Sequence, residues 1–283
     1  MNGPGMFVWQ AAKCCGGSPR EFVSLAQRQG WNWIAPKVIN ESGAVRTADM
    51  EFIRAAQGRL QDAGVSIVPW CYLRPPNVSA MAKLCADVCV ELAATEFIVN
   101  AEIEFKRYSD KEDRAKEFCE AFKRHAPKCR LHLSTFAQPS LHGDFPYRAF
   151  LERCDGFMPQ CYGNSPEKQL HEAAAVASQY GVALIPTFRA YCGDGRDSKP
   201  GILQEAPQMA EKAKNLGCPA WNWWHWQSVE GWPEMLEALQ FSTGDLLTCP
   251  GCAQLRTELR SLTEKVRNQM QILEGILAAG EKK

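Results

Sequence analysis

Residues 47–72 read TADMEFIRAAQGRLQDAGVSIVPWCY. Within this stretch, Thr47–Ala63 has the spacing of an amphipathic helix, whereas Val65–Tyr72 is a short apolar run with β-branched and aromatic residues, typical of a strand. Gly64 lies between them, and glycine is the residue that most often ends a helix. The stretch therefore predicts a helix that stops at a glycine and leads directly into a strand.

The same order recurs along the whole chain. Glycines that end an amphipathic stretch just before a strand candidate are Gly30, Gly64, Gly181 and Gly217. The strand candidates are Phe7–Gln10, Trp31–Val38, Val65–Tyr72, Phe97–Phe105, Arg130–Phe136, Gly156–Tyr162, Ala183–Tyr191 and Ala220–Gln227. The helical stretches between them are Ser18–Gln29, Thr47–Ala63, Ser79–Ala94, Lys111–His125, Pro166–Tyr180 and Ala206–Leu216. Eight repeats over about 240 residues predict an α/β fold, a (β/α)8 TIM barrel, with a doubly wound open sheet as the alternative.

The composition is that of a folded protein without net charge. Of the 283 residues, 46% are hydrophobic and 23% are charged, which excludes disorder as the main state. Since 32 basic residues balance 32 acidic ones, no global positive field attracts nucleic acid, and we expect no nucleic-acid partner. No apolar run is long enough for a membrane span, and Met1–Gly5 lacks the features of a signal peptide. We therefore expect synthesis in a cytoplasm.

The cysteines predict thiols rather than a disulfide framework. There are thirteen, an odd number, and they are scattered singly along the chain, so we expect most of them to be buried and free. Only Cys249 and Cys252 have the spacing of metal ligands, and they supply two of the four that zinc prefers. The sequence has no glycine-rich phosphate loop, no HExxH, no GxSxG and no metal spacing among its histidines. No cofactor is predicted.

The last forty residues differ from the repeats before them. We predict a barrel over residues 1–244, a CxxC linker over 245–252 and a helix over 253–283. Apolar residues of this helix follow steps of four and three, as in a coiled coil, with Gln269 in one slot; they are Leu255, Leu259, Leu262, Val266, Leu273 and Ile276. Because a lone helix of this length is marginal in water, we expect a parallel homotrimer. The alternative is an amphipathic helix packed on its own barrel.

The fourth strand candidate carries the clearest chemical signal. Active sites of TIM barrels lie at the C-terminal ends of the strands. In Phe97–Phe105, side chains alternate with period two, so Asn100, Glu102 and Glu104 are expected on one face near that end. Two neighbouring carboxylates raise one another's pKa and divide into an acid and a base. The alternative is that Glu104 lies beyond the strand and pairs with Lys106 or Arg107.

The other strand ends carry aromatic and polar side chains that suit a sugar, since aromatic plates stack on sugar rings while amides and hydroxyls bind the rim. Four of the nine tryptophans lie in the eighth candidate, and we expect about two of them to line a pocket. Lys37, His132, Phe136 and Thr187 also close strands. The predicted substrate-binding residues are Trp9, Gln10, Trp70, Tyr72, Asn100, Ser134, Gln160, Tyr162, Arg189, Tyr191, Trp224 and Trp226.

Three segments resemble a known group of proteins. They are Asn100-Ala101-Glu102, Met158-Pro159-Gln160-Cys161-Tyr162 and Trp224-His225-Trp226-Gln227. They resemble TIM-barrel proteins of bacteriophages and actinobacteria that are related to the lysozyme-like glycoside hydrolases of family 25, over roughly residues 6–240. That family has Asp-x-Glu on strand four with the glutamate as catalytic acid, which gives this role to Glu102 and places Asn100 where the family has Asp. Phe7–Gln10 also lacks the Asp that the family carries on strand one.

A second resemblance is to the chitinase-like glycoside hydrolases of family 18. Their strand-four Asp-x-Asp-x-Glu aligns with Asn100-Ala101-Glu102-Ile103-Glu104, which makes Glu104 the acid and places Glu102 at the middle Asp. Tyr162 then matches the tyrosine that holds the reacting N-acetyl group. The two alignments differ on the acid, and we prefer Glu102 because the segments around Gln160 and Trp224 favour the phage group.

Two functions follow from these resemblances. The first is a glycosidase that acts on an N-acetylated glycan of the peptidoglycan type, carried on a phage particle or tail by the C-terminal helix together with other virion proteins. The second is a virion protein of the same fold that binds glycan, or serves as structure, without catalysis. Asn100 favours the second, and the pair Glu102 and Glu104 favours the first. A barrel enzyme for phosphorylated metabolites is disfavoured, because no glycine-rich segment follows the seventh or eighth strand.

Overall fold

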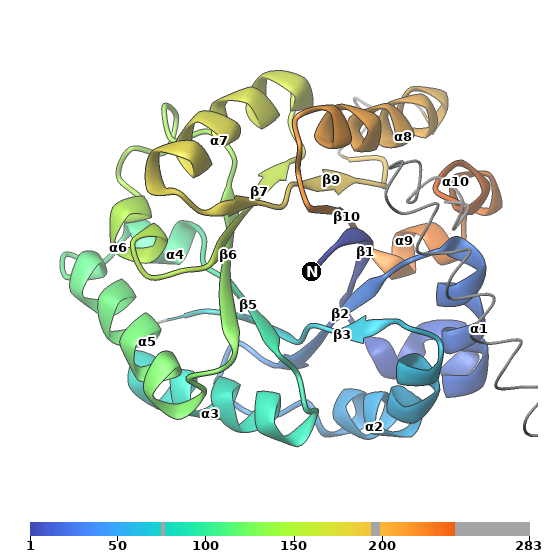
Figure 1. The fold of residues 1–283 in the computed structure, drawn as a ribbon, viewed down its shortest axis with the longest axis horizontal. Helices are drawn as coiled ribbons and strands as arrows, with labels where there is room; N and C mark the ends of the chain where they lie inside the picture. Colours follow the sequence, from blue (N-terminus) through green and yellow to red (C-terminus); the bar gives the residue numbers. More distant parts are fainter. Residues whose placement is uncertain (75–76, 194–198, 241–283) are drawn as a thin grey trace, which may run out of the picture. The chain divides into compact units, whose positions relative to one another are not determined.

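The computed structural model describes residues 1–74, 77–193 and 199–240. Its strands form one parallel sheet in the order β1-β10-β9-β7-β6-β5-β4-β2-β3, and β1 also pairs with β2, which closes a barrel (Figure 1). The strands are β1 (Gly3–Val8), β2 (Trp33–Ile39), β3 (Ser66–Ile67), β4 (Trp70–Tyr72), β5 (Glu96–Asn100), β6 (Arg130–Phe136), β7 (Gly156–Cys161), β8 (Ala183–Leu184), β9 (Thr187–Arg189) and β10 (Ala220–Trp224). These ten strands occupy eight positions around the barrel, so the predicted TIM barrel is confirmed.

Two positions of the barrel are divided into short strands at a proline. Val68 and Pro69 separate β3 from β4, and Ile185 and Pro186 separate β8 from β9. Proline has no N–H to donate to the ladder, so strand pairing is interrupted there. The chain nevertheless keeps its path, because the Pro69 carbonyl accepts from the Ile98 N–H at 3.0 Å and the Pro186 carbonyl from the Asn222 N–H at 3.0 Å.

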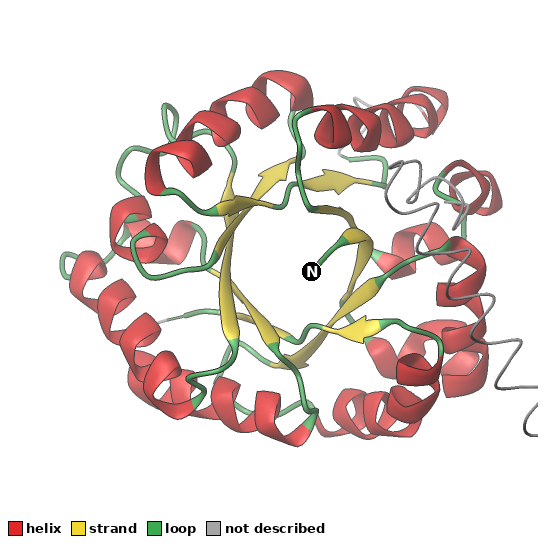
Figure 2. Ribbon diagram, in the orientation of Figure 1, coloured by secondary structure: helices red, strands yellow, loops and turns green. Residues whose placement is uncertain are grey.

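The helices surround the sheet (Figure 2). They are η1 (Ala11–Gly17, a 3₁₀ helix), α1 (Pro19–Gln29), α2 (Thr47–Asp62), α3 (Val78–Glu91), α4 (Ile103–Lys106), α5 (Lys111–His125), α6 (Tyr147–Leu151), α7 (Pro166–Tyr180), α8 (Lys199–Asn215), α9 (Trp226–Glu230) and α10 (Pro233–Ala238). The four predicted helix-ending glycines have positive φ, at 68° for Gly30, 71° for Gly64, 64° for Gly181 and 74° for Gly217. This left-handed conformation favours glycine over other residues, and the predicted helix ends are confirmed.

The predicted strands that hold the candidate site end earlier than their sequence patterns. β1 ends at Val8, β5 at Asn100 and β10 at Trp224. After β5 the chain turns at Glu102 (φ −135°, ψ −138°) and enters the short helix α4, and after β10 it enters α9. The alternating pattern of apolar residues continues past the ends of β5 and β10. The sequence therefore predicted strand for residues at which the chain has already turned.

Large side chains fill the interior of the barrel. Phe7, Trp33, Trp70, Ile98 and Met158 are each almost completely buried there. Gly5 of β1 makes room for this packing, because a Cβ at Gly5 would lie 2.1 Å from the Trp33 ring. The barrel is therefore a packed core and not a channel, as is general for this fold.

A charged cluster lies at the N-terminal end of the strands, opposite the candidate site. Glu96 begins β5, and its carboxylate is 2.7 Å from His132 Nε2 and 2.7 Å from an Arg130 nitrogen. The amino group of Met1 also contacts Glu96. The N-terminal end of the chain lies at the centre of the barrel in Figure 1. His132 and Glu96 are 1% and 7% exposed, so the Glu96 charge and the hydrogen bonds of both residues act in a poorly hydrated environment.

Met1–Gln240 forms one compact unit. The predicted linker over 245–252, with Cys249 and Cys252, and the predicted coiled coil over 253–283 lie outside the described residues. None of the helices in the described ranges is long and apolar enough to cross a membrane.

Candidate active site

Glu102 lies directly beyond the C-terminal end of β5 and is held by two amide side chains. Its Oε1 accepts from Asn100 Nδ2 at 2.9 Å and from Gln160 Nε2 at 2.8 Å. The second hydrogen of Gln160 Nε2 points to Asn100 Oδ1 at 3.1 Å, and Ser134 Oγ is 3.5 Å from the same nitrogen. The structure thus brings Asn100, Glu102, Ser134 and Gln160 together from β5, β6 and β7. One carboxylate oxygen is fixed, which orients the whole group.

Glu104 belongs to α4 and has a different environment. Tyr72 donates its hydroxyl to Glu104 Oε2 at 2.5 Å, and an Arg74 nitrogen is 3.2 Å from Oε1. Burial, followed by the hydrogen bond to Glu104, raises the pKa of Tyr72 far above its usual value. The expectation that Asn100, Glu102 and Glu104 share one strand face is corrected, because the strand ends at Asn100. The alternative partners Lys106 and Arg107 are corrected as well, since Glu104 pairs with Arg74.

Two tyrosines lie close to the Glu102 cluster. Tyr162 and Tyr191 follow β7 and β9, and their rings meet edge to face at 6.1 Å. Burial raises the pKa of Tyr162, and the charges of Tyr191 and Glu102 raise it further, so its hydroxyl stays protonated and can donate.

Trp9 and Gln10 lie on the segment after β1. Trp9 is 43% exposed, the only exposed tryptophan among the described residues. The backbone N–H of Trp9 donates to Gln227 Oε1 at 3.2 Å, while Gln227 Nε2 donates to the Gln10 carbonyl at 2.9 Å. The His225 ring lies 6.1 Å from the Trp9 ring. Gln227 therefore fixes the backbone beneath an exposed aromatic plate.

The tryptophans of the eighth strand candidate, Ala220–Gln227, lie in different environments. Trp224 is half-buried and contacts Phe7 and Trp70 at ring distances of 5.5 and 5.6 Å. Trp226 is fully buried and stacks on Phe22 of α1 at 4.2 Å. Trp226 is removed from the candidate site, because its ring packs on the outer helix layer. The structure describes all four tryptophans of the eighth strand candidate. Only Trp224 has appreciable exposed surface, whereas about two of the four were expected to line a pocket.

Trp70 and Arg189 lie next to the candidate site, but both side chains are buried. Trp70 is 1% exposed, donates its Nε1–H to the Val8 carbonyl at 3.4 Å, and lies under the Lys37 ammonium, 5.1 Å from the ring. This burial corrects its assignment as a stacking plate for a sugar. Arg189 is 9% exposed and is held through two nitrogens by Glu205 of α8, at 2.9 and 3.3 Å.

Two charged side chains beside the candidate site, Arg74 and Glu205, were missed by the sequence analysis, and Lys106 has other partners than the one predicted. Arg74 lies two residues beyond the third strand candidate, and reading that far past the strand end would have found it. Glu205 lies on α8, far along the chain from Arg189, and no sequence signal joins them. Lys106, which contacts both His142 and Asp144, ties α4 to the segment after β6. These contacts depend on the tertiary fold.

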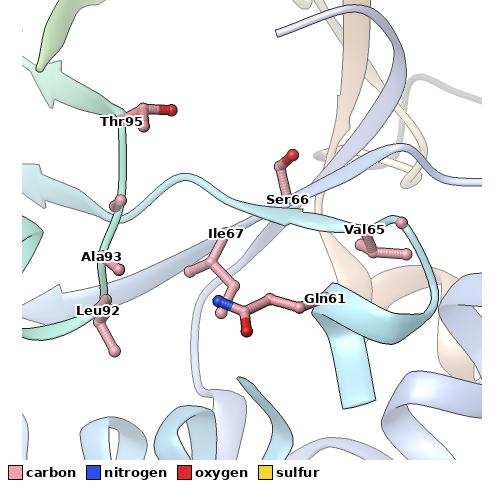
Figure 3. Close-up of a pocket in the computed structure, with 9 residues that line it drawn as sticks. Gln61, Val65, Ser66, Ile67, Leu92, Ala93 and Thr95 are labelled. Atoms are coloured by element: carbon pink, nitrogen blue, oxygen red, sulfur yellow. The ribbon is translucent and has the colours of Figure 1, made fainter. Parts of the chain in front are cut away.

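The candidate site contains no recognisable metal centre. In residues 1–74, 77–193 and 199–240, no group of three or more His, Cys, Asp or Glu side chains could hold a metal ion. A pocket of about 280 Å³ near Ser66 and Thr95 (Figure 3) lies at the N-terminal ends of β3 and β5. This is the end of the barrel opposite Glu102 and Glu104. In this fold that face serves stability, so we do not assign the pocket to the site.

The comparisons with known proteins identify the fold. No protein-family model and no curated protein matches the chain. The structure is similar to a GH18 chitinase from Pseudoalteromonas aurantia, with 12% identity, a TM-score of 0.53, and coverage of 84% of this chain and 98% of that one. It is similar to the spore cortex-lytic enzyme SleL of Bacillus cereus, with 9% identity, a TM-score of 0.60, and coverage of 85% and 74%.

The glycoside hydrolase domain of PgaB from Bordetella bronchiseptica is a further similar structure, with 9% identity, a TM-score of 0.54, and coverage of 86% of this chain and 100% of that one. Identities this low show the fold alone. The barrel is thus one that glycoside hydrolases use, while the resemblance to family 25 and a phage origin stay predictions.

Proposed function

We propose that the chain is a glycoside hydrolase acting on an N-acetylated glycan of the peptidoglycan type, with Glu102 as the general acid. The observation that carries the proposal is the position of Glu102 at the C-terminal end of β5, where Asn100 and Gln160 bind the same carboxyl oxygen. Because Oε1 accepts both amide hydrogen bonds, Oε2 is the oxygen that carries the proton and meets the glycosidic oxygen.

The environments of the two glutamates support this assignment. Glu104 accepts from Tyr72 and pairs with Arg74, and a carboxylate bound to a guanidinium is an acceptor that gives up no proton. Glu102 is bound only by neutral amides in the described structure, which accommodate a carbonyl oxygen as readily as a carboxylate. Glu104 then provides negative charge near the cationic transition state that glycosidases share.

Aromatic and phenolic groups complete the binding site. Trp9 offers an exposed face for a sugar ring, and Trp224 offers a partly exposed one. Tyr162 remains a proton donor for an N-acetyl carbonyl. These groups match an N-acetylated sugar, with apolar ring faces and one amide, better than a charged metabolite.

The test is turnover by the full chain of peptidoglycan and of chitin oligomers. Glu102→Gln should lower kcat by about a hundredfold or more, as expected for loss of a general acid, with unchanged folding by circular dichroism. Glu234→Gln, at an exposed position of α10, is the matched control and should keep full activity. Full activity of Glu102→Gln together with loss in Glu104→Gln would move the acid to Glu104 and support the family 18 alignment.

A second candidate function is glycan binding without hydrolysis. It is favoured by Asn100, which stands where the family 25 resemblance has Asp, and which is fully engaged with Glu102 and Gln160. Under this function the wild-type chain would bind N-acetylglucosamine oligomers in calorimetry, with weaker binding by Trp9→Ala, and would show no turnover of either glycan.

The predicted C-terminal helix adds an assembly role to the proposal. It would join three chains and attach the barrels to a phage particle or tail. Its residues lie outside the described part of the chain, so this role is supported by the heptad spacing from Leu255 to Ile276.

A further inference from the structure

The fold brings six of the scattered cysteines together in three pairs. The sulfur atoms of Cys71 and Cys85 are 3.6 Å apart, as are those of Cys89 and Cys129. Cys119 and Cys154 form the third pair through a hydrogen bond. Each pair joins a helix to a strand or to a residue one or two positions before a strand. The cysteines in the described residues are free thiols, but these six are not isolated.

Only one of the two pairs at 3.6 Å adjoins a described pocket. Cys89 in the last turn of α3 and Cys129 just before β6 both line a pocket of about 370 Å³, together with Val90, Ala126 and Pro127. Cys71 and Cys85 have no exposed surface. The pocket adjoins the one in Figure 3, with which it shares the segment from Ala93 to Thr95. Of the two pairs at 3.6 Å, Cys89–Cys129 is therefore the one that a small molecule in this pocket can approach.

Two basic side chains line this pocket, and a third, Lys123, which pairs with Asp155, lies near it. His125 and Lys128 line it, and Lys123 Nζ lies 3.4 Å from the Cys129 carbonyl oxygen. All three belong to the end of α5 or the residues after it. Positive charge beside the pocket attracts a small anionic disulfide such as oxidised glutathione.

We propose that Cys89 and Cys129 form an oxidation site, in which a small anionic disulfide of the glutathione class converts the two thiols into a disulfide between α3 and β6. The sulfurs are already in van der Waals contact, so they must approach by about 1.5 Å to reach the length of a disulfide bond. This inference is independent of the proposed hydrolase activity, because the pair lies at the N-terminal end of the barrel.

The reaction is an ordinary thiol–disulfide exchange. The Cys129 thiolate attacks one sulfur of oxidised glutathione and expels a glutathione thiolate, which leaves a mixed disulfide on Cys129. The Cys89 thiolate then attacks the Cys129 sulfur and expels the second glutathione thiolate. Two protein thiols are oxidised, one glutathione disulfide is reduced to two thiols, and the two cysteine protons go to the released glutathione.

Cys129 attacks first for two reasons. It is the more exposed of the two, at 5% against 2% for Cys89. The hydrogen bond with Cys129, followed by burial, raises the pKa of the Cys89 thiol, which disfavours its thiolate.

The test incubates the reduced full chain with graded ratios of oxidised to reduced glutathione, blocks remaining thiols with N-ethylmaleimide and maps the peptides by mass spectrometry. We expect a cross-linked peptide pair joining Cys89 to Cys129, two hydrogens lighter than the separate thiol peptides. Because the bond closes a loop of some forty residues, Tm should rise by about 5 to 15 °C and return on reduction.

Matched serine variants separate this site from the other cysteines. Cys129→Ser should abolish both the cross-link and the rise in Tm, whereas Cys85→Ser should keep both. The proposal is overturned if Cys89 and Cys129 remain fully alkylated at every ratio, if the glutathione adduct on Cys129 never closes, or if Cys71 and Cys85 cross-link as fast as the pair in the pocket.

Discussion

Gln160 shows how a single amide can control a carboxyl group. Its Nε2 gives one hydrogen to Glu102 and the other to Asn100, so it fixes both the acid and the residue that orients the acid. A hydrogen bond to a charged or reacting carboxyl contributes about 1.5 to 3 kcal/mol. The catalytic behaviour of Glu102 should therefore depend on a residue that takes no part in the proton transfer.

The first prediction follows from this contact. Gln160→Leu should lower kcat on chitin oligomers by about tenfold or more, since the acid loses a donor that orients it, while KM changes less. Gln208→Leu, at an exposed position of α8, is the control and should match the wild type. Equal kcat in both variants would show that Asn100 alone positions Glu102.

The second prediction concerns the charged cluster at the opposite end of the barrel. Burial alone would raise the pKa of Glu96, but hydrogen bonds from His132 and the Met1 amino group outweigh it and lower that pKa from 4.5 to about 2. Burial lowers the pKa of His132 below its usual 6.5. Both shifts mean that the unfolded chain binds more protons, so stability falls as pH drops, first through 6.5 and then from 4.5 towards 2.

Thermal unfolding of the wild type and of Glu96→Gln, measured over a range of pH, tests the lowered pKa of Glu96. The variant should be less stable than the wild type at pH 7, and the difference should shrink as pH falls from 4.5 to 2, because the wild-type carboxylate is then being protonated. Glu51→Gln, at an exposed position of α2, should show no such convergence. A constant difference between wild type and Glu96→Gln across this range would contradict the lowered pKa.

At the level of elements, Gly5 illustrates a close approach between neighbouring strands. A methyl group there would lie 2.1 Å from the Trp33 ring, and this ring fills the barrel interior. Gly5→Ala should therefore lower the free energy of unfolding by about 3 kcal/mol or more, as overpacking of a rigid core does. Chemical denaturation measures the loss.

Gly58→Ala is the matched control for that variant. Gly58 lies inside α2, and a Cβ there meets nothing within 4 Å. Alanine is the better helix former, so this change should stabilise the protein by about 0.5 to 1 kcal/mol. A similar effect of both substitutions would show that β1 can move away from Trp33.

The elements also show what the sequence could predict. Glycines at helix ends and apolar runs were sufficient to predict the barrel. A helix end such as Gly30 or Gly181 depends on the local backbone conformation, which the local sequence determines. The ends of β5 and β10 could not be predicted, since Ile103 and Trp226 continue the strand pattern after the chain has turned. Glu102 and Gln160 were predicted as site residues from the alternation of side chains and from the strand ends. Arg74 and Glu205 were not, because only the tertiary fold brings them to their partners.

At the scale of the whole molecule, one prediction concerns the number of chains. The heptad spacing of residues 255–276 predicts a parallel trimer, because the apolar seam of a lone helix needs a partner. Light scattering should give three times the chain mass for the full chain and one chain mass for a version ending at Gly244. Monomers in both samples would refute the coiled coil, and trimers in both would place the interface on the barrel.

The pairing of β1 with β10 has a consequence for biosynthesis. Among the described strands, the one made first pairs with the one made last, because Gly3 to Met6 lie beside Ala220 to Trp223. At about 5 to 20 residues per second, the ribosome takes roughly 10 to 40 s to deliver that partner. Throughout this time the nascent chain exposes one unpaired edge of β1, and such an edge can pair with the wrong chain. Release of the last strand from the ribosome is thus the step at which the nascent protein becomes safe from aggregation.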